Sequence, residues 1–483
     1  MSDSHLETED TFDVDDAFVV PPLTDFLPRG GRTETVTSRL RSSYLDTVDL
    51  ALLRARVTLR RREGDDDQGW HLKVPAGSSR LEIHRPLGDT PENVVPDALA
   101  ALVAGLADGQ PLLPVAVVAT TRTRHRVLDA AGALVVEVDD DRVAATPAGR
   151  ATRHWREVEV ELGTGSSGLL ARVGVALRAE GARTAAVTSK LARTLGEPVG
   201  ERAAGRPAAA GLHAYLAEQV DVIVAGDIDL RRGQDPVHGT RVATRRFRST
   251  LRVFATLVDA DRSAWIDGEL RWWAGELGQA RDAQVQRARH RASLDALPPE
   301  LVLGPVRARI DDDTTGAEAR AREQIAAELD DDRYRALLRE LLRWRAAPPF
   351  TPAAQAGRKV LRAGAAAASA QADTRLRQAV DGDDDEQLHR ARKAAKRARY
   401  AQEVVRLTGE RADRRAAKAV ARHHQQVQTV LGDHQDGVVA AALLRRLGAE
   451  AGARGENGFT FGVLWQREQQ LADAARTRVP TLA

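Results

Sequence analysis

The sequence predicts an α+β protein, in which an N-terminal eight-stranded antiparallel β tunnel with flanking helices precedes an all-α domain of two repeated helical units. Three observations support this prediction. Residues 1–195 alternate polar and apolar side chains, residues 207–483 space apolar side chains as helices do, and a basic helical pattern occurs twice in the second half. We therefore expect domains at 1–198 and 207–483, a linker rich in glycine, proline and alanine at 199–206, and repeats at about 207–345 and 352–483.

The composition excludes several classes of protein. The 483 residues carry a net charge of only +2 although 29% of them are charged, so the distribution of charge matters more than its sum. The absence of cysteine excludes disulfides, thiolate catalysis and cysteine-bound zinc. The acidic N-terminus and the lack of any apolar stretch of about 18 residues argue against a signal peptide and a membrane span, and we expect a cytoplasmic protein.

The first half contains eight segments with the period of two that is typical of strands. In residues 156–162, glutamate occupies every second position between valines and a leucine, and in residues 56–63 arginine alternates in the same way. For any one strand, a solvated polar face is the ordinary explanation. Because several strands share the pattern, we expect the sheet to close around a charged interior in which carboxylates hold a divalent metal and arginines hold a polyanion. The expected strands lie near 5–14, 34–45, 54–63, 69–75, 80–86, 115–129, 133–145 and 153–162, with helices at 91–107 and 167–181.

The second half repeats a basic helix face led by histidine. Basic residues follow His238 and His389 at positions three, seven and ten, which lie on one stripe of an α-helix. A second landmark, LGQARDAQV at 277–285 and LGDHQDGVV at 431–439, follows each stripe in the same order and indicates an internal duplication. No acid lies between 236 and 252 or between 387 and 402, so an anion is the natural ligand of these faces, although a solvated basic face is the alternative. We expect the two helices to start at matching points, after Asp235–Pro236 and at Asp385–Glu386.

Metal binding by the histidines is not expected. His238 and His389 have no histidine or carboxylate three or four residues further on. His423 and His424 are adjacent in sequence, so we expect them to point in different directions.

The basic pattern resembles the CHAD domain, a helical domain of two repeated units, over most of 207–483. The segments that carry the resemblance are HGTRVATRRFRS and HRARKAAKRARY. The resemblance implies that inorganic polyphosphate binds along a basic groove. Its ligands would be His238, Arg241, Arg245, Arg248, His389, Arg392, Lys393, Lys396 and Arg399.

The first half resembles the CYTH domain, a family of eight-stranded tunnel enzymes that hydrolyse triphosphates or cyclise ATP with Mg²⁺ or Mn²⁺. The resemblance is distributed over ETEDT, RVTLRRRE, HLKVP, TRTR, VEVDDD, REVEVEL and SKLAR. It implies that Glu7, Glu9, Asp139, Glu157 and Glu159 bind the metal, with Glu7, Glu9, Glu157 and Glu159 also counted as catalytic. It implies that the triphosphate is bound by Arg60, Arg62, Lys73, Arg122, Arg124 and Lys190.

One position departs from the CYTH pattern. The first-strand signature is E-x-E-x-K, and Thr11 stands where the family has the lysine. Loss of one donor to a transition state typically costs about 10²–10³ in rate. The sequence thus predicts a polyphosphate-binding protein with a metal-dependent triphosphatase tunnel, and the alternative is a non-catalytic polyphosphate-binding protein associated with granules. Nucleic-acid binding is less favoured because aromatic residues make up only 4% of the chain, and ATP cyclisation is a remote fourth alternative.

Overall fold

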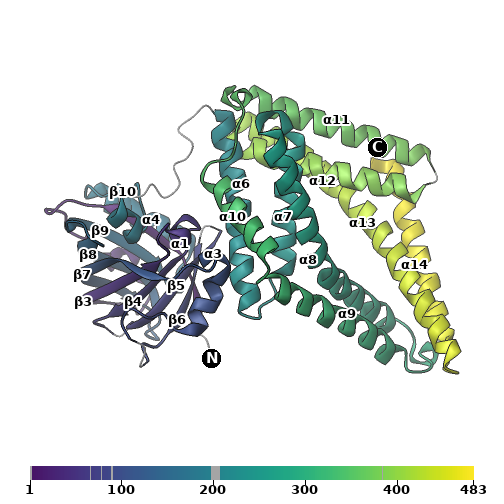
Figure 1. Ribbon diagram of the computed structural model, residues 1–483, viewed down its shortest axis with the longest axis horizontal. Helices are drawn as coiled ribbons and strands as arrows, with labels where there is room; N and C mark the ends of the chain where they lie inside the picture. Colours follow the sequence, from purple (N-terminus) through teal and green to yellow (C-terminus); the bar gives the residue numbers. More distant parts are fainter. Residues whose placement is uncertain are drawn as a thin grey trace. The chain divides into compact units, whose positions relative to one another are not determined.

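The computed structural model describes residues 3–65, 67–77, 79–88, 91–196, 207–382 and 384–482 (Figure 1). The chain divides into two compact units. One comprises Met1–Glu201 and Asp227–Arg232, and the other comprises Arg202–Gly226 and Gly233–Ala483. The linker expected at 199–206 lies outside the described residues.

The first unit contains one antiparallel sheet of ten strands rather than the eight predicted, in the order β1-β6-β5-β4-β3-β7-β8-β9-β2-β10. The expected first strand, 5–14, is two strands because the chain changes partners at Thr8: β1 pairs with β6, whereas β2 pairs with β9. The tenth strand has two residues, too few to show any period in the sequence. The strands are β1 Asp3–Glu7, β2 Glu9–Asp13, β3 Arg32–Asp46, β4 Thr58–Glu63, β5 Gly69–Ala76, β6 Ser79–Arg85, β7 Leu113–Leu128, β8 Leu134–Pro147, β9 Arg153–Leu162 and β10 Arg183–Thr184.

The change of partner at Thr8 closes the sheet. Since β1 and β2 are consecutive in the chain, the strand that pairs with β6 continues directly into the strand that pairs with β9. The Thr8 hydroxyl is hydrogen-bonded to the Ser79 hydroxyl at the start of β6, with 2.8 Å between the oxygens. The sheet therefore has an inner face, where one set of alternate side chains meets, and an outer face.

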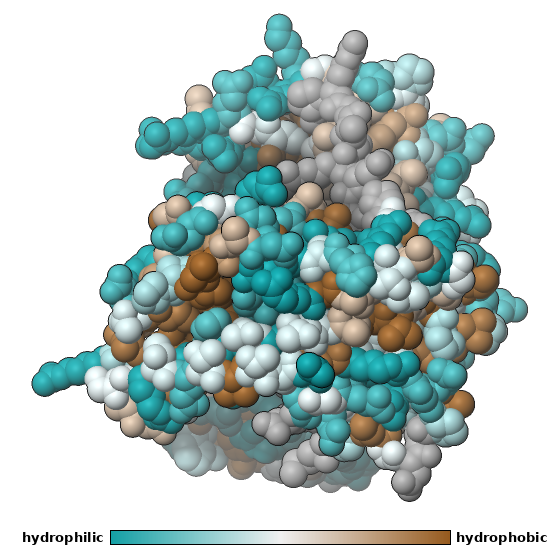
Figure 2. All heavy atoms as spheres, turned by 90° about the vertical axis from the view of Figure 1, so that its left-hand side faces the viewer, coloured by the Kyte–Doolittle hydropathy of each residue, from teal (hydrophilic) through white to brown (hydrophobic). Residues whose placement is uncertain are grey.

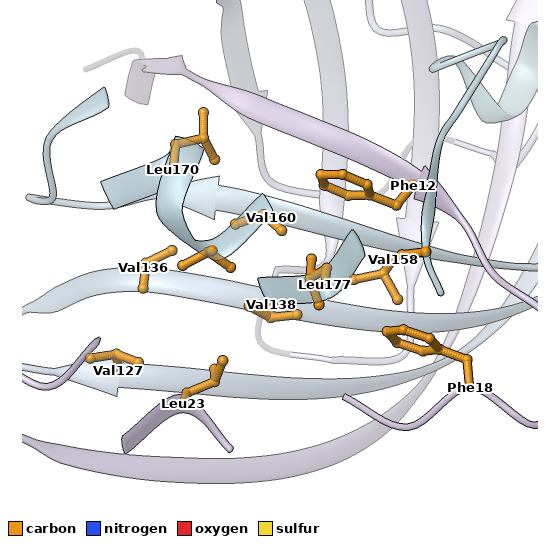
Figure 3. Packing of buried hydrophobic residues seen from close by; sticks show 12 residues of the cluster. Phe12, Phe18, Leu23, Val127, Val136, Val138, Val158, Val160, Leu170 and Leu177 are labelled. Carbon is orange, nitrogen blue, oxygen red and sulfur yellow. The ribbon is translucent and has the colours of Figure 1, made fainter. Parts of the chain in front are cut away.

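The outer face is apolar where α4 (Ser167–Ala179) covers it. Phe12, Val138, Val158, Val160 and Leu177 are each no more than 1% exposed and pack together there (Figure 3). Burying each such side chain stabilises the fold by about 1.5–3 kcal/mol. Because successive side chains on a strand face opposite ways, this packing directs the intervening acidic residues of β8 and β9 inward.

The helix expected at 91–107 is shorter and broken. Pro96 is the N-cap of α2 (Asp97–Ala100), which is followed by a 3₁₀ turn and by α3 (Ala104–Ala107). Proline lacks a backbone donor and disfavours helical conformation in the residue before it, so the helix cannot extend back to residue 91. Two further short helices, α1 (Ala51–Arg54) and α5 (Lys190–Leu195), were not predicted.

On the face shown in Figure 2, hydrophobic side chains occur as small separate groups among hydrophilic ones. Single exposed apolar residues such as Leu6 and Val19 are ordinary features of a protein surface.

The second unit is helical. The expected break at 345–357 falls between α10 and α11, where Pro352–Gln355 forms a 3₁₀ turn. No helix in the described part of the chain has both the length and the apolar content needed to cross a bilayer. The helices are α6 Pro207–Arg231, α7 Val237–Val253, α8 Ala260–Asp295, α9 Val306–Glu328, α10 Asp332–Ala346, α11 Lys359–Asp381, α12 Asp385–Thr408, α13 Arg411–Ala453 and α14 Phe459–Thr477.

The two basic helices, α7 and α12, do not start at matching points. Pro236 is the N-cap of α7 and makes no side-chain capping bond, whereas Asp384 caps α12 by accepting a hydrogen bond from the Glu386 amide. His238 therefore lies in the first turn of its helix and His389 in the second. Relative to these histidines the two helix starts differ by three residues, since α7 begins one residue before His238 and α12 four residues before His389.

The contacts of α7 with α8 resemble those of α12 with α13. A Cβ on Gly278 would lie 3.1 Å from the Arg241 guanidinium, and a Cβ on Gly432 would lie 3.2 Å from that of Arg392. The same arginines face the matching acids: Arg241 is 2.8 Å from Asp282, and Arg392 is 3.8 Å from Asp436. The glycine and the aspartate of each LG landmark thus receive the arginine of the preceding basic stripe, which supports the hypothesis of a duplication.

Candidate functional site

The inner face of the sheet surrounds a charged cavity of about 330 Å³. All six basic residues expected from sequence to bind triphosphate line it: Arg60, Arg62, Lys73, Arg122, Arg124 and Lys190. Of the five acids expected to bind metal, Glu7, Glu9 and Glu159 line the cavity, while Asp139 and Glu157 are buried beside it at 3% and 1% exposure. Strand alternation therefore brings the predicted residues of both signs into one place.

Lys190, at the start of α5, holds three carboxylates together. Its ammonium nitrogen is 2.6 Å from Glu159, 2.7 Å from Glu157 and 3.0 Å from Asp141. Burial opposes the charge of Lys190, but the three acids outweigh it and raise the pKa of the lysine. Helix α5 can place the lysine there because Ser189 caps its first turn and Leu191 and Ala192 are buried against the sheet.

Arg122 on β7 contacts two of these acids, Asp141 and Glu159. It donates to both carboxylate oxygens of Asp141, at 2.7 and 2.6 Å, and to Glu159 at 2.8 Å, and it also pairs with Asp139. Burial would raise the pKa of Glu159, but Lys190 and Arg122 more than offset burial and lower it. In this structure Arg122 and Lys190, which the sequence predicts to bind phosphate, are thus neutralised by the carboxylates that it predicts to hold a metal.

On another part of the cavity wall, Lys73 and Glu82 belong to a second group of paired charges. Lys73 lies 2.6 Å from Glu7 and 4.0 Å from Glu82, and Arg60 lies 3.7 Å from Glu82. The His71 ring is hydrogen-bonded to Glu82 at 2.7 Å. Burial opposes the Glu82 charge, yet Lys73 and this hydrogen bond lower the pKa of Glu82.

The sequence reasoning missed several residues of the cavity wall and its surroundings. Arg80 and Glu82 alternate on β6 and Glu161 follows Glu159 on β9, so the period of two could have identified all three. Asp141 is fully buried and lies two positions after Asp139 in the same pattern. Burial raises the pKa of Glu161 to about 7, and the charge of Glu7 adds to the shift. The remaining lining residues missed are His5, Tyr44, Thr58, Asp67, Arg126, Leu134, Glu137, Thr188 and Ser189.

The carboxylates suit a hard divalent cation. Ligand oxygens of Asp141, Glu157 and Glu159 lie within 4.8 Å of one another. Asp139 Oδ1 is buried without a hydrogen-bond partner among the described residues, so an acceptor is available beside them. Mg²⁺ and Mn²⁺ prefer such oxygen ligands.

Thr11 faces Glu159 across the β2–β9 pair and is 3% exposed. Its hydroxyl is buried and has no hydrogen-bond partner in the described part of the chain. The acid opposite it is already neutralised by Lys190 and Arg122, so the charge that a lysine at position 11 would supply is present from other elements.

In the second unit, α7 and α12 line a cavity of about 480 Å³, here called the basic groove. Six of the nine residues expected to bind polyphosphate line it: Arg245, Arg248, His389, Arg392, Lys393 and Lys396. His238, Arg241 and Arg399 do not. The additional lining residues are Ser249, Arg252, Arg271, Arg397 and Tyr400.

The absence of acids within the basic helices does not mean that all their charges are free. Neighbouring helices supply partners: Asp267 of α8 accepts from Arg248 at 3.0 Å, and Glu403 lies 3.0 Å from Arg246. The inference that no acid neutralises these faces was therefore wrong in part, because it considered one helix at a time. No described carboxylate forms an ion pair with Arg245, Lys393, Lys396 or Arg397, and these four retain uncompensated charge.

The uncompensated charges repel one another. Burial, together with Arg392, Arg245 and Arg241, lowers the pKa of Lys396 to about 7. Burial and the neighbouring cations also lower the pKa of His389. An anion that binds to such a cluster relieves this repulsion and lowers the free energy of the cluster.

A second basic cavity, of about 1030 Å³, follows further along α12 and reaches α13. Five cations line it without a described ion pair: Arg406, Arg411, Arg414, Arg415 and Lys418. Glu403, which accepts a hydrogen bond from the Tyr215 hydroxyl at 2.8 Å, also lines this second cavity.

These features define two charged sites, one inside a closed sheet and one on paired helices. The family model of the CYTH domain matches residues 27–194 and that of the CHAD domain matches residues 214–445. The uncharacterized proteins MT2285 and Rv2226 of two Mycobacterium tuberculosis strains are each 36% identical over 502 residues, covering 98% of this chain and 95% of each relative. The chain belongs to the family in which a CYTH domain is followed by a CHAD domain.

Two solved structures are similar to part of the chain. PptA from Streptomyces chartreusis is 23% identical, with a TM-score of 0.46 over 57% of this chain and 99% of that one. The CHAD domain from Ricinus communis is 23% identical, with a TM-score of 0.45 over 58% of this chain and 94% of that one.

Proposed function

We propose that the tunnel hydrolyses inorganic triphosphate, or a related triphosphate, with Mg²⁺ or Mn²⁺, and that the basic groove binds inorganic polyphosphate. The observation that carries the first part is the convergence of six cations and several carboxylates on one enclosed cavity. A triphosphate needs several donors along its length, and a metal needs adjacent oxygen ligands.

Each group has a distinct part in this proposal. Arg60, Arg62 and Lys73 would bind one end of the triphosphate, and Arg122, Arg124 and Lys190 the other. Asp139, Asp141, Glu157 and Glu159 would hold the metal, which would supply charge neutralisation and activation of water when bound. We expect substrate and metal to bind together. A phosphate that pairs with Arg122 or Lys190 displaces the carboxylate that is paired there, and this carboxylate can then bind the metal.

The test is phosphate release from tripolyphosphate by the purified protein with Mn²⁺ or Mg²⁺. Release should fall at least 10²-fold in Glu159→Gln, since this residue lies against both Lys190 and Arg122. Glu180→Gln, at an exposed residue after α4, is the matched control and should retain wild-type release. Equal release by both variants and the wild type would exclude the tunnel as the active site.

A non-catalytic tunnel is the second candidate function, favoured by Thr11 with its unpartnered buried hydroxyl. In that case tripolyphosphate would bind without turnover, and the protein would act as a polyphosphate-binding protein at granules. Calorimetric binding without phosphate release would establish it.

Polyphosphate binding by the groove rests on its four uncompensated cations. Arg245→Gln combined with Lys396→Gln should weaken polyphosphate binding about tenfold or more at fixed salt. Arg320→Gln combined with Arg445→Gln removes the same charge from exposed positions elsewhere and should have little effect. Competition between polyphosphate and duplex DNA decides against nucleic acid if polyphosphate displaces DNA and DNA fails to displace polyphosphate.

A further inference from the structure

Three potential metal ligands meet between α11 and α13, and none of them lines a cavity described above. Asp373 lies on α11, and His423 and His424 lie on α13. One ligand atom of each residue lies within 4.8 Å of the others, and His423 Nε2 is 3.8 Å from the Asp373 carboxylate. The adjacent histidines, which we expect from sequence to point in different directions, thus each bring one nitrogen close to the same carboxylate.

The helix geometry explains the convergence. Successive residues on an α-helix are about 100° apart, so two neighbours can lie on either side of the line that faces another helix. The two imidazole rings are 5.1 Å apart at 62° to each other. Leu376 of α11 and Val427 of α13 belong to one buried cluster, and they follow Asp373 and His424 by three residues each, so packing holds the two helix segments in register.

The described structure offers no other reason for the burial of the His424 imidazole. It is only 1% exposed, and its Nε2 atom is buried without a hydrogen-bond partner among the described residues. Buried polar atoms are normally paired, because an unpaired one forfeits its bonds to water.

We propose that Asp373, His423 and His424 form a binding site for a divalent transition-metal ion of the Zn²⁺ type. Two imidazole nitrogens and one carboxylate oxygen are a ligand set that suits zinc, whereas the tunnel offers only carboxylates at its buried acidic cluster. Asp373 and His423 are about half exposed, at 49% and 43% of their side chains, which gives the ion a path from solvent and leaves room for a water ligand.

A metal ion bound at this site would link α11 to α13. Both helices pack on α12 in the same buried cluster, and α12 carries His389, Lys393 and Lys396 of the basic groove. Metal binding is therefore expected to stabilise the helical unit, and this role is independent of any activity in the tunnel.

The experiment is titration of metal-stripped, full-length protein with Co²⁺ as a spectroscopic probe for Zn²⁺. The wild type should develop the visible bands of four-coordinate cobalt at one equivalent, and Zn²⁺ should remove them. His423→Ala and Asp373→Asn, both at half-exposed positions, should each weaken cobalt binding by about tenfold or more. Zn²⁺ should also raise the melting temperature of the wild type and leave that of His423→Ala unchanged.

Two control variants test other histidine-containing clusters. His5→Ala removes a ligand from the group with Glu7 and Glu161, and His84→Ala from the group with Asp67 and His71. Both variants should keep the cobalt bands. The proposal is overturned if the wild type shows no bands at saturating Co²⁺, if the bands persist in both His423→Ala and Asp373→Asn, or if His5→Ala or His84→Ala abolishes them.

Discussion

Replacement of Lys190 by methionine removes the cation that three buried carboxylates share. Lys190 lies within 3.0 Å of Asp141, Glu157 and Glu159 and is itself buried. Breaking a buried ion pair by removing one partner typically costs about 3–5 kcal/mol, because a charge is left without compensation. For a unit of roughly 200 residues, each kcal/mol lowers the melting temperature by about 2–4 °C, so the expected fall is about 6–20 °C.

A divalent cation should restore much of this loss. In Lys190→Met the carboxylates retain their closeness, within 4.8 Å, and lack their ammonium partner, so Mn²⁺ should bind them more tightly than in the wild type. An ion present at 100 times its dissociation constant stabilises the folded state by about 2.7 kcal/mol. Differential scanning calorimetry with EDTA or with Mn²⁺ measures both effects, and Lys359→Met, at an exposed lysine of α11, is the matched control.

The pH dependence of the free energy of unfolding should also change sign in Lys190→Met. In the wild type the lowered pKa of Glu159 contributes stability above its unfolded pKa of about 4.3, which is lost as the pH falls. Without Lys190 the carboxylates repel one another and the pKa values of Glu157 and Glu159 rise, so the variant should become more stable as the pH falls from 7 towards 5. A loss below about 1 kcal/mol, or equal responses to Mn²⁺ in variant and wild type, would refute the reasoning.

Three further predictions concern other parts of the chain. The pKa of Lys396 is lowered to about 7, so above that pH Lys396 should take up a proton when an anion binds, and anion affinity should weaken by up to about tenfold per pH unit. Calorimetry in two buffers of different ionisation enthalpy counts the proton, and Lys396→Arg should remove the effect. Thr11→Lys should raise tripolyphosphate turnover by about 10²–10³ if the tunnel lacks a donor, and an unchanged rate would mean that Lys190 already fills this role. Gly432→Ala should displace Arg392, which packs on the glycine and lines the basic groove, and reduce polyphosphate affinity several-fold, whereas Gly452→Ala, where a Cβ meets no atom within 4 Å, should not.

The strand pattern was sufficient to predict most of the tunnel wall. Period two assigns each residue of a strand to one face, so the alternation alone places Arg60, Arg62, Arg122 and Arg124 on one charged surface. The same rule puts Glu161 on the face of Glu157 and Glu159, and its application to β6 would have added Glu82. The count of ten strands could not be obtained in this way, because a change of pairing partner at Thr8 leaves the alternation undisturbed.

By itself, the sequence determined the two classes of structure, the inward charged face of the sheet and the basic stripes of α7 and α12, because these depend on periodicity within single elements. Only the tertiary structure decided which charges are paired. Lys190 meets Asp141 from a helix further along the chain, and Arg248 is neutralised by Asp267 from the next helix, while no described carboxylate forms an ion pair with Lys396. Electrostatic interactions depend on distance in space, and a sequence specifies distance only within one element, so the free charges that favour anion binding become visible only when the elements are packed together.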